Sequence, residues 1–345
     1  MFSRQYLLRE VGIKGQLKLL KTKVAVIGCG ATGSLTAELL ARAGIGYLRI
    51  IDRDFVELSN IPRSSLHTLS DALNMKPKSV SCAEKLSQIN PYVKVDYAVS
   101  EVNPQNIEDL VSDVDVIIDG TDNMRTRYLI NDVALKLSKP WIMQGVSTWY
   151  GQVLLIKPRV TACLRCLLPT PPPEVGNACD VMGVMNVTVS MTASVTASEV
   201  IKYVLGLESG GELIYVDAKR SQITRFSLTR NPSCPACSLN KLEFLESSEY
   251  VRAKRICGSN SVQVYPSGPI NLNISELKQL DDKLPNEIRI HLITPYLLKA
   301  SVRGYEVVLF SDGRAIINNL TDEELATRIY EDLIKSLHLL EVSRG

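Results

Sequence analysis

The sequence predicts an α/β protein built on a doubly wound sheet, and three observations carry this prediction. The apolar runs 24–27 and 47–51 are typical of buried parallel strands. A glycine-rich turn, GCGATG at 28–33, directly follows the first run and leads into a segment with helical character. A third apolar run, 116–118, ends in the polar stretch Asp119-Gly120-Thr121. This succession indicates a Rossmann-like sheet with functional loops at the carboxyl ends of its strands.

The glycine-rich turn predicts a site for phosphate. Gly28, Gly30 and Gly33 let the chain turn sharply and bring backbone N–H groups and a helix N-terminus against an anion. Asp52 lies about 20 residues beyond the turn, where its carboxylate can accept hydrogen bonds from ribose hydroxyls. These features indicate an adenine nucleotide, and they fit NAD as well as ATP.

Charged residues further along the chain favour ATP. Arg63, Lys78 and the Asp122-Asn123 pair supply two cations and a carboxylate near the ends of successive strands. Each by itself is typical of a solvated surface charge, but attack on the α-phosphate of ATP needs such groups to hold phosphate charge and the departing pyrophosphate. An NAD-linked oxidoreductase is the alternative function, and it leaves Arg63, Lys78 and Asp122 without a role.

With these motifs the chain resembles the ThiF/MoeB/HesA family, the activating enzymes for ubiquitin-like and sulfur-carrier proteins. The resemblance runs from about Arg4 to Leu242. The motifs that carry it are Ser3-Arg4-Gln5-Tyr6, Asp52-Arg53-Asp54, Ser59-Asn60, Arg63, Lys78, Thr121-Asp122-Asn123, Gly151-Gln152-Val153, Cys163-Leu164-Arg165-Cys166 and Asn231 to Cys237.

The resemblance implies a sheet that is parallel in its first half and mixed in its second, and it implies site residues. Asp52 is expected to hold the ribose, Arg63 and Lys78 the triphosphate, and Asp122 the Mg²⁺ ion. Arg4 is expected to reach the γ-phosphate side of a partner subunit's site, which implies a homodimer. The full nucleotide-binding set is Gly28, Gly30, Gly33, Asp52, Asp54, Asn60, Arg63, Lys78, Asp122 and Asn123. Pro62 and Ser64 depart from the family pattern around Arg63, so a non-catalytic scaffold is a second alternative.

The chain contains 8 cysteines, and four of them form two Cys-x-x-Cys pairs. Thiolates at this spacing can bind one side of a tetrahedral zinc ion, and two such pairs complete a four-sulfur structural site. A redox Cys-x-x-Cys is the alternative, but it does not predict a second pair. The predicted zinc ligands are Cys163, Cys166, Cys234 and Cys237.

Cys179 lies in a segment rich in Pro and Gly, residues 169–180, which is typical of an exposed loop. Its position matches the reactive cysteine of family members that pass on the activated carboxylate or sulfur, so Cys179 is the predicted acceptor thiol. Cys29 and Cys82 are expected to be ordinary packed thiols, and Cys257 is ambiguous. The three histidines, His67, His291 and His338, share no spacing that indicates a metal site or a base.

Composition excludes several classes of partner. The formal net charge is +2, and the basic residues are scattered, so nucleic acid and anionic membranes are not expected partners. The N-terminus lacks a secretory signal pattern, which indicates a cytoplasmic protein. Residues 181–198 carry too many Ser and Thr for a membrane span. Polar and apolar residues alternate from 187 to 198 as in a strand, but the resemblance predicts a helix that Gly206 ends.

Three regions are expected: an adenylation domain at 1–242, a charged connector at 243–255 and a small α+β domain at 256–345. In the last region the sequence predicts strands at 262–265, 288–292, 305–310 and 315–317, with a hairpin turn at 311–314. Thr321 is expected to cap a helix, with Glu324 at the capping-box position. This domain is expected either to support packing and dimerisation or to dock a carrier protein.

The sequence therefore predicts an ATP-dependent enzyme that adenylates the C-terminal carboxylate of a small β-grasp carrier protein ending in Gly-Gly. The activated group is expected to pass to Cys179, as a thioester or in a sulfur transfer that leaves a thiocarboxylate. The expected cofactors are ATP, Mg²⁺ and Zn²⁺. A sulfur donor or a conjugating enzyme is the expected later partner.

Overall fold

The computed structural model of the 345-residue chain divides into two compact units, Met1–Ser248 and Glu249–Gly345, and each is described by itself. The boundary falls within the stretch expected to be a connector. The residues that the structure describes are 1–171, 182–207, 210–247, 252–255, 260–266, 272–274, 277, 284–285 and 287–342.

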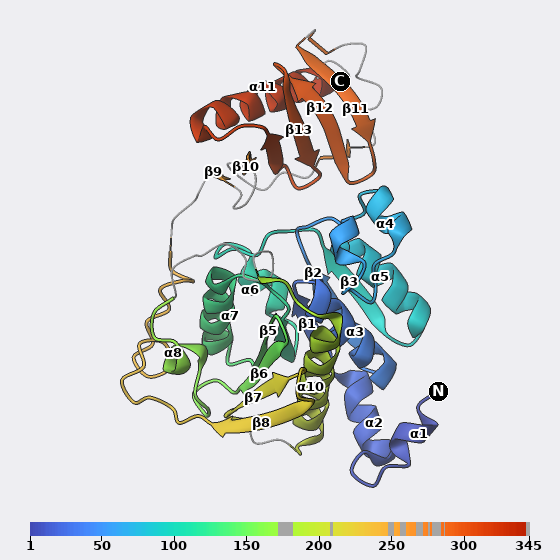
Figure 1. Ribbon diagram of the computed structural model, residues 1–345, viewed down its shortest axis with the longest axis vertical. Coiled ribbons are helices and arrows are strands. Elements are labelled where there is room, and N and C mark those ends of the chain that lie inside the picture. The colour runs from blue at the N-terminus through green and yellow to red at the C-terminus, as the bar shows by residue number, and fades with distance from the viewer. Residues whose placement is uncertain are drawn as a thin grey trace. The chain divides into compact units, whose positions relative to one another are not determined.

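The first unit contains an 8-stranded sheet with the order β3-β2-β1-β4-β5-β6-β7-β8 (Figure 1). The pairs joining β1, β2, β3, β4 and β5 are parallel, and the pairs from β5 to β8 are antiparallel. The prediction of a doubly wound sheet with a parallel half and a mixed half is confirmed. The strands are β1 (Lys23–Ile27), β2 (Tyr47–Ile51), β3 (Lys94–Ala98), β4 (Val116–Asp119), β5 (Trp141–Ser147), β6 (Tyr150–Ile156), β7 (Glu212–Asp217) and β8 (Gln222–Ser227).

Helices cover both faces of this sheet. One face packs on α3, α5 and α10, and the opposite face packs on α6, α7 and the segments that carry the paired cysteines (Figure 1). The helices of this unit are α1 (Ser3–Tyr6), α2 (Gly12–Lys21), α3 (Ala31–Ala43), the 3₁₀-helix η1 (Leu58–Asn60), α4 (Leu69–Leu73), α5 (Lys78–Ile89), α6 (Ile107–Val111), α7 (Met124–Leu137), α8 (Leu164–Leu167) and α10 (Asn186–Leu205).

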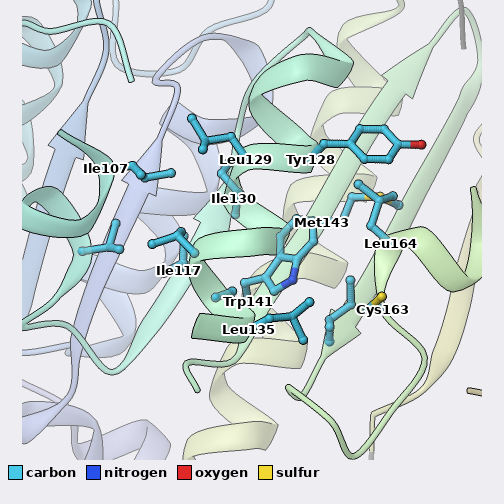
Figure 2. Close-up of a cluster of buried hydrophobic side chains, with 14 of the residues drawn as sticks. Ile107, Ile117, Tyr128, Leu129, Ile130, Leu135, Trp141, Met143, Cys163 and Leu164 are labelled. Atoms are coloured by element: carbon cyan, nitrogen blue, oxygen red, sulfur yellow. The ribbon is translucent and has the colours of Figure 1, made fainter. Parts of the chain in front are cut away.

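The central strands β1 and β4 are apolar because they are buried on both faces. In β1, Ala25 and Ile27 belong to the core on the α7 side, whereas Val24 and Val26 belong to the core on the α3 side. Figure 2 shows the α7-side core, in which Trp141 lies among side chains of α7 and beside the segment that contains Cys163. The two cores together hold the strand ends that carry the candidate site.

The segment with alternating polarity is a helix, as the resemblance predicted. Thr188, Thr192 and Thr196 recur every fourth residue and are fully buried, and two of their hydroxyls donate to the carbonyl four residues earlier. A Cβ at Gly151 of β6 would lie 1.9 Å from the Thr192 hydroxyl, so helix and strand approach closely there. The helix ends at Gly206, whose φ of 76° is left-handed.

The second unit is an antiparallel 6-stranded sheet, in the order β11-β12-β13-β14-β10-β9, with α11 (Glu323–Val342) packed against its core. The hairpin turn between β13 and β14 is confirmed, and Gly313 within it has a φ of 82°. The predicted strands are all present, but β9 and β12 were not anticipated. The strands are β9 (Ala253–Arg255), β10 (Ser261–Val264), β11 (Ile288–Ile293), β12 (Leu297–Val302), β13 (Tyr305–Phe310) and β14 (Ala315–Asn318).

The predicted cap of α11 is wrong by one residue. The Asp322 carboxylate, not the Thr321 hydroxyl, accepts the backbone N–H groups of Glu324 and Leu325 at 2.9 and 3.0 Å. A carboxylate is the stronger acceptor and adds a favourable charge at the helix N-terminus.

Part of the expected connector also belongs to the first core, because the Phe244 ring packs against the Tyr128 ring at a tilt of 37°, with ring centroids 4.8 Å apart. Among the described residues, no helix is long and apolar enough to span a membrane.

Candidate functional site

The site lies where β1 and β4 end side by side, at the point where the strand order reverses. The loops after these strands touch through glycine. A Cβ at Gly28, whose φ is 89°, would lie 2.5 Å from the Gly120 carbonyl oxygen, and a Cβ at Gly120 would lie 2.2 Å from the Gly28 oxygen. Both positions therefore require glycine, and the contact holds the two loops against each other.

The glycine-rich turn leaves space in front of α3. Gly33 is needed for packing, because a Cβ there would lie 1.9 Å from the Gly28 carbonyl oxygen. Gly30 is the N-cap of α3, and a Cβ on it would meet no atom within 4 Å. The residues thus form a cradle at a helix N-terminus, where free N–H groups favour an anion. This arrangement fits the phosphates of a nucleotide.

Asp52 is held rigidly beside the turn. Its two oxygens accept the backbone N–H groups of Cys29 at 2.6 Å and Asp54 at 2.8 Å. Burial raises the pKa of Asp52, while the nearby charge of Lys78 opposes that shift. Each oxygen has a second lone pair, so the carboxylate can still accept from ribose hydroxyls.

Lys78 is the first residue of α5 and lies beside two carboxylates. Its Nζ donates to Asp54 Oδ2 at 3.1 Å, and its backbone N–H donates to the Asp54 carbonyl at 2.8 Å. Burial lowers the pKa of Lys78, but the charges of Asp54, Asp52 and Asp122 outweigh burial and raise it above its ordinary value. The ammonium group therefore stays charged, as a ligand for phosphate must.

The loop that carries Asp122 is fixed by residues that the sequence analysis missed. Asp119 is fully buried, and its Oδ1 accepts the N–H and the hydroxyl of Thr121 at 2.9 and 2.6 Å. Arg127, eight residues later on α7, donates to the other oxygen of Asp119 at 2.6 Å. A carboxylate ending an apolar strand, followed by an arginine in the next helix, is the signal that could have found this pair.

Two of the predicted nucleotide ligands serve as helix caps. Asn60 Oδ1 accepts the Glu57 N–H at 3.1 Å at the start of η1. Asn123 Oδ1 accepts the Thr126 N–H at 2.9 Å and caps α7. Arg63 lies partly exposed in the turn after η1, and among the described residues its guanidinium makes no hydrogen bond.

Arg4 does not lie at the end of the sheet that carries this site. Its neighbour Gln5 donates to the Ala43 carbonyl at 2.9 Å, and the ring of Phe2 lies against Gly44. These contacts place α1 beside the C-terminus of α3, at the edge where the parallel strands begin. The structure therefore does not bring Arg4 to the nucleotide site of its own chain.

Cys29 and Cys82 form a disulfide, which corrects the expectation that they are separate packed thiols. Both are fully buried, and the link joins the glycine-rich turn to α5. Their separation of 53 residues gave no sequence signal, because only the fold brings the turn and the helix together. His67 lies in the same cluster, and hydrogen bonds to Cys29 and Ser81 occupy both of its ring nitrogens.

The four paired cysteines come together, as predicted. Their sulfurs all lie within 4.8 Å of one another, with Cys163 Sγ 3.6 Å from Cys234 Sγ and Cys166 Sγ 3.5 Å from Cys237 Sγ. A tetrahedral zinc with Zn–S bonds of about 2.3 Å places its sulfurs about 3.8 Å apart. Burial is the main cause that raises the pKa of Cys163, and the neighbouring thiols raise it as well. Because the thiolate form is disfavoured, four thiolates need a bound cation to stay close together.

Helix α7 positions this cysteine cluster. Asn131 Oδ1 accepts the Leu164 N–H at 3.1 Å, and Asp132 Oδ2 accepts the Phe244 N–H at 3.0 Å. Burial raises the pKa of Asp132 to about 6. The cysteine cluster is therefore hydrogen-bonded to α7, the same helix whose N-terminus follows Asp122.

Two other predicted thiols cannot be placed. Cys179, the predicted acceptor, and Cys257 lie outside the described residues, as does the side chain of His338. His291 is exposed in the second unit and contacts Ser301 Oγ at 2.6 Å.

The fold and the site define a nucleotide-binding α/β enzyme with a four-cysteine metal site. The chain belongs to the ThiF family, whose model matches residues 2–236. The prediction of an adenylyltransferase is confirmed at this level, since the similar proteins are named as such.

Two relatives are similar over much of the chain. The sulfur carrier protein ThiS adenylyltransferase of Bacillus subtilis is 34% identical over 96% of this chain and 98% of its own length, so the match includes both units. The adenylyltransferase and sulfurtransferase MOCS3 of Xenopus laevis is 36% identical over 83% of this chain, which spans 64% of that longer protein.

Solved structures share the fold. E. coli MccB superposes with a TM-score of 0.59 at 22% identity, covering 68% of this chain and 71% of MccB. A crystal structure of E. coli MccB with ATP matches with a TM-score of 0.56 at 22% identity, covering 64% of this chain and 68% of MccB. At this identity the likeness concerns the fold alone.

Proposed function

We propose that this protein uses ATP to adenylate the C-terminal carboxylate of a small sulfur-carrier or ubiquitin-like protein that ends in Gly-Gly. The observation that carries the proposal is the convergence of Gly30, Asp52, Lys78 and Asp122 at one sheet edge. Membership of the ThiF family and the names of the relatives support the choice of substrate.

The proposed reaction needs little from the protein beyond positioning and charge. The carrier carboxylate is ionised at neutral pH and attacks the α-phosphorus, which gives an acyl-adenylate and pyrophosphate. The α3 N-terminus and Lys78 hold the phosphates, and Asp52 accepts from the ribose. Mg²⁺ held by Asp122 would supply further positive charge for the departing pyrophosphate. No histidine base is required.

A homodimer completes this site in the proposal. Arg4 lies at the opposite edge of the sheet from Lys78 in the same chain, so it can serve only the site of a second copy. Arg63 would then bind the triphosphate from within the chain. The four-cysteine cluster would hold a structural zinc ion and remain apart from the reaction.

The second proposed step uses Cys179. Its thiolate would attack the acyl carbon and release AMP, which leaves the carrier as a thioester. A persulfide on Cys179 would instead give an acyl disulfide, and a second thiol would then release the carrier thiocarboxylate. The persulfide reaction requires a sulfur donor that loads Cys179. The thioester reaction requires a conjugating enzyme that takes the carrier from Cys179.

Carrier-dependent exchange of labelled pyrophosphate into ATP tests the proposed function. Each small Gly-Gly-ending protein from the same genome is added in turn to the zinc-loaded enzyme, and a carrier lacking its last two residues is the matched control. Exchange with one full-length carrier, and none with its truncated form, is the expected result. Absence of exchange with every carrier, in protein that binds ATP, would favour the non-catalytic scaffold.

A further inference from the structure

We propose that His67 is a positioning residue for adenylation: its ring orients the Cys29–Gly30 peptide so that the Gly30 N–H faces the nucleotide phosphates. The inference rests on the proposed function, since it requires phosphate beside Gly30. His67 precedes α4, outside the glycine-rich turn, and the sequence analysis gave it no role.

The contacts of the ring fix its tautomer. Nε2 lies 2.9 Å from the Cys29 carbonyl oxygen, and Nδ1 lies 3.2 Å from Ser81 Oγ. A carbonyl oxygen can only accept, so Nε2 must carry the proton. His67 is 5% exposed and therefore lies outside the reach of solvent that could replace this bond. It connects the glycine-rich turn to Ser81 in the first half of α5, the helix that begins with Lys78.

Because a peptide is planar, the bond from His67 to the Cys29 oxygen also sets the direction of the Gly30 N–H. In a trans peptide the C=O and the following N–H lie in one plane and point in opposite directions. A hydrogen bond from His67 to the Cys29 oxygen therefore directs the Gly30 N–H away from α5. The preceding peptide is fixed separately, because the Cys29 N–H donates to Asp52 at 2.6 Å.

The Cys29–Gly30 peptide needs such a restraint. Gly30 has φ −76° and ψ −143°, and without a Cβ it can adopt many other conformations at little cost. The Cys29–Cys82 disulfide fixes the Cys29 side chain, but it does not set the rotation of the peptide that follows. Among the described residues, His67 is the side chain that donates to the oxygen of that peptide, because Cys82 Sγ, 3.9 Å from the same oxygen, is bonded to Cys29 Sγ and carries no hydrogen.

The protonation state of His67 suits this task. Burial, together with the positive charges of Lys78 and Lys85, lowers the pKa of His67 to about 4, although the Cys29 hydrogen bond and Asp71 act in the opposite direction. The ring is therefore neutral at physiological pH. It donates to the turn from Nε2 as a neutral ring.

Binding of Mg·ATP measured by calorimetry tests the role without requiring catalysis. His67→Gln keeps an N–H donor at the place of Nε2, whereas His67→Asn and His67→Phe do not. We expect Phe and Asn to weaken ATP binding about tenfold, the effect of one buried hydrogen bond, and Gln to restore most of the affinity. The matched control is Asn90→Leu, which removes another buried bond, Asn90 Nδ2 to the Ala41 carbonyl at 2.7 Å, beyond the far end of α5.

The outcomes separate this inference from the proposed function. Equal ATP affinity in wild type, Phe and Gln variants would overturn the role of His67, as would an equal loss in Asn90→Leu. Weakened ATP binding without any carrier-dependent exchange in wild type would uphold His67 and refute the proposed function.

A measurement on the unmodified enzyme covers the case in which the variants do not fold. With 3 histidines in the chain, ¹⁵N NMR of the ring nitrogens should show one ring that is neutral at pH 6 and protonated on Nε2. Its signals should shift when Mg·ATP binds. If every ring titrates near its ordinary pKa, or if none responds to ATP, the inference fails.

Discussion

Arg127 Nε donates to Asp119 Oδ2 at 2.6 Å, and this buried ion pair connects three parts of the site. A second nitrogen of the same guanidinium, Nη2, donates to the carbonyls of Thr121 and Gln144, each at 2.8 Å. One side chain thus ties the end of β4, the Asp122 loop and β5 together. These bonds hold the loop that is proposed to bind Mg²⁺ against both strands.

Replacing Arg127 by Met should lower the free energy of unfolding by about 3 kcal/mol, because it leaves the fully buried Asp119 carboxylate without its cation. Urea unfolding followed by tryptophan fluorescence measures the change, and both tryptophans, Trp141 and Trp149, report on the first unit. Arg42→Met is the control, since Arg42 pairs with Glu38 at the surface and should cost less than about 0.5 kcal/mol. Equal losses in the two variants would contradict the role given to the buried pair.

Removal of a charge at the phosphate site should reduce catalysis and leave the fold intact. We expect Lys78→Ala, Arg63→Ala and Asp122→Ala each to slow carrier-dependent pyrophosphate exchange about 10²-fold or more. Lys76→Ala is the matched control, because Lys76 pairs with Glu84 on α5. Exchange at the wild-type rate in the Asp122 and Arg63 variants would refute the assigned nucleotide site.

Cys179→Ala should separate the two proposed steps. Adenylation does not use a thiol, so pyrophosphate exchange should continue at the wild-type rate. The thiol-linked carrier should disappear, as measured by intact mass under non-reducing conditions. Carrier that is still linked to the variant enzyme would assign the transfer to another cysteine.

Metal removal should unfold the four-cysteine cluster. Binding energy at such sites is on the order of 10 kcal/mol and is coupled to folding, so Cys234→Ser should lose the zinc and lower thermal stability. Elemental analysis should find one zinc per wild-type chain. Ser233→Ala changes the exposed neighbour and should keep both properties. The cluster is not a zinc site if the purified wild type contains no metal, all four thiols react, and a chelator leaves its thermal stability unchanged.

Asp132 should make stability depend on pH in an identifiable window. Its pKa is raised from 3.8 to about 6, so between these values the folded state binds the proton more tightly than the unfolded state. Stability contributed by the protonated form is present below pH 3.8 and is lost as pH rises through 6. Asp132→Asn keeps an acceptor for the Phe244 N–H and has no proton to lose. Its free energy of unfolding relative to wild type should therefore rise by about 2 to 3 kcal/mol as pH increases from 4 to 6.

Asp113→Asn provides a control of opposite sign, because the hydrogen bond from Arg49 lowers the pKa of Asp113. Its stability relative to wild type should fall, not rise, as pH increases through the acid range. Urea midpoints from about pH 2 to 8 distinguish the two, because the Asp113 effect develops as pH falls below its ordinary pKa of 3.8. A flat difference between Asp132→Asn and wild type would remove the assigned shift.

Patterns among residues adjacent in sequence predicted much of the fold. The apolar run before Gly28 and the turn itself predicted a strand, a phosphate cradle and a helix, because each depends on residues adjacent in sequence. The two Cys-x-x-Cys pairs predicted the metal cluster although they are far apart in sequence, because each pair is a local pattern and a tetrahedral ion needs both. The helix at 186–205 was harder, because its buried Thr residues also alternate with apolar ones.

Contacts between distant segments could not be read from the sequence. The Asp119–Arg127 pair, the Cys29–Cys82 disulfide and the bond from His67 to Cys29 each depend on how elements pack. The sequence also carried no sign that Asn60 and Asn123, which stay predicted nucleotide ligands, accept backbone N–H groups at the starts of η1 and α7.

The sequence by itself determined the chemistry of this protein: the glycine cradle, the carboxylate at 52, the cation at 78 and the four thiolates. Tertiary structure alone decided which groups hold these residues in place. The physical reason is that a residue type fixes what an atom can donate, accept or bind, whereas orientation comes from packed neighbours. His67 and Arg127 act through such neighbours, and neither belongs to a local pattern that reveals it.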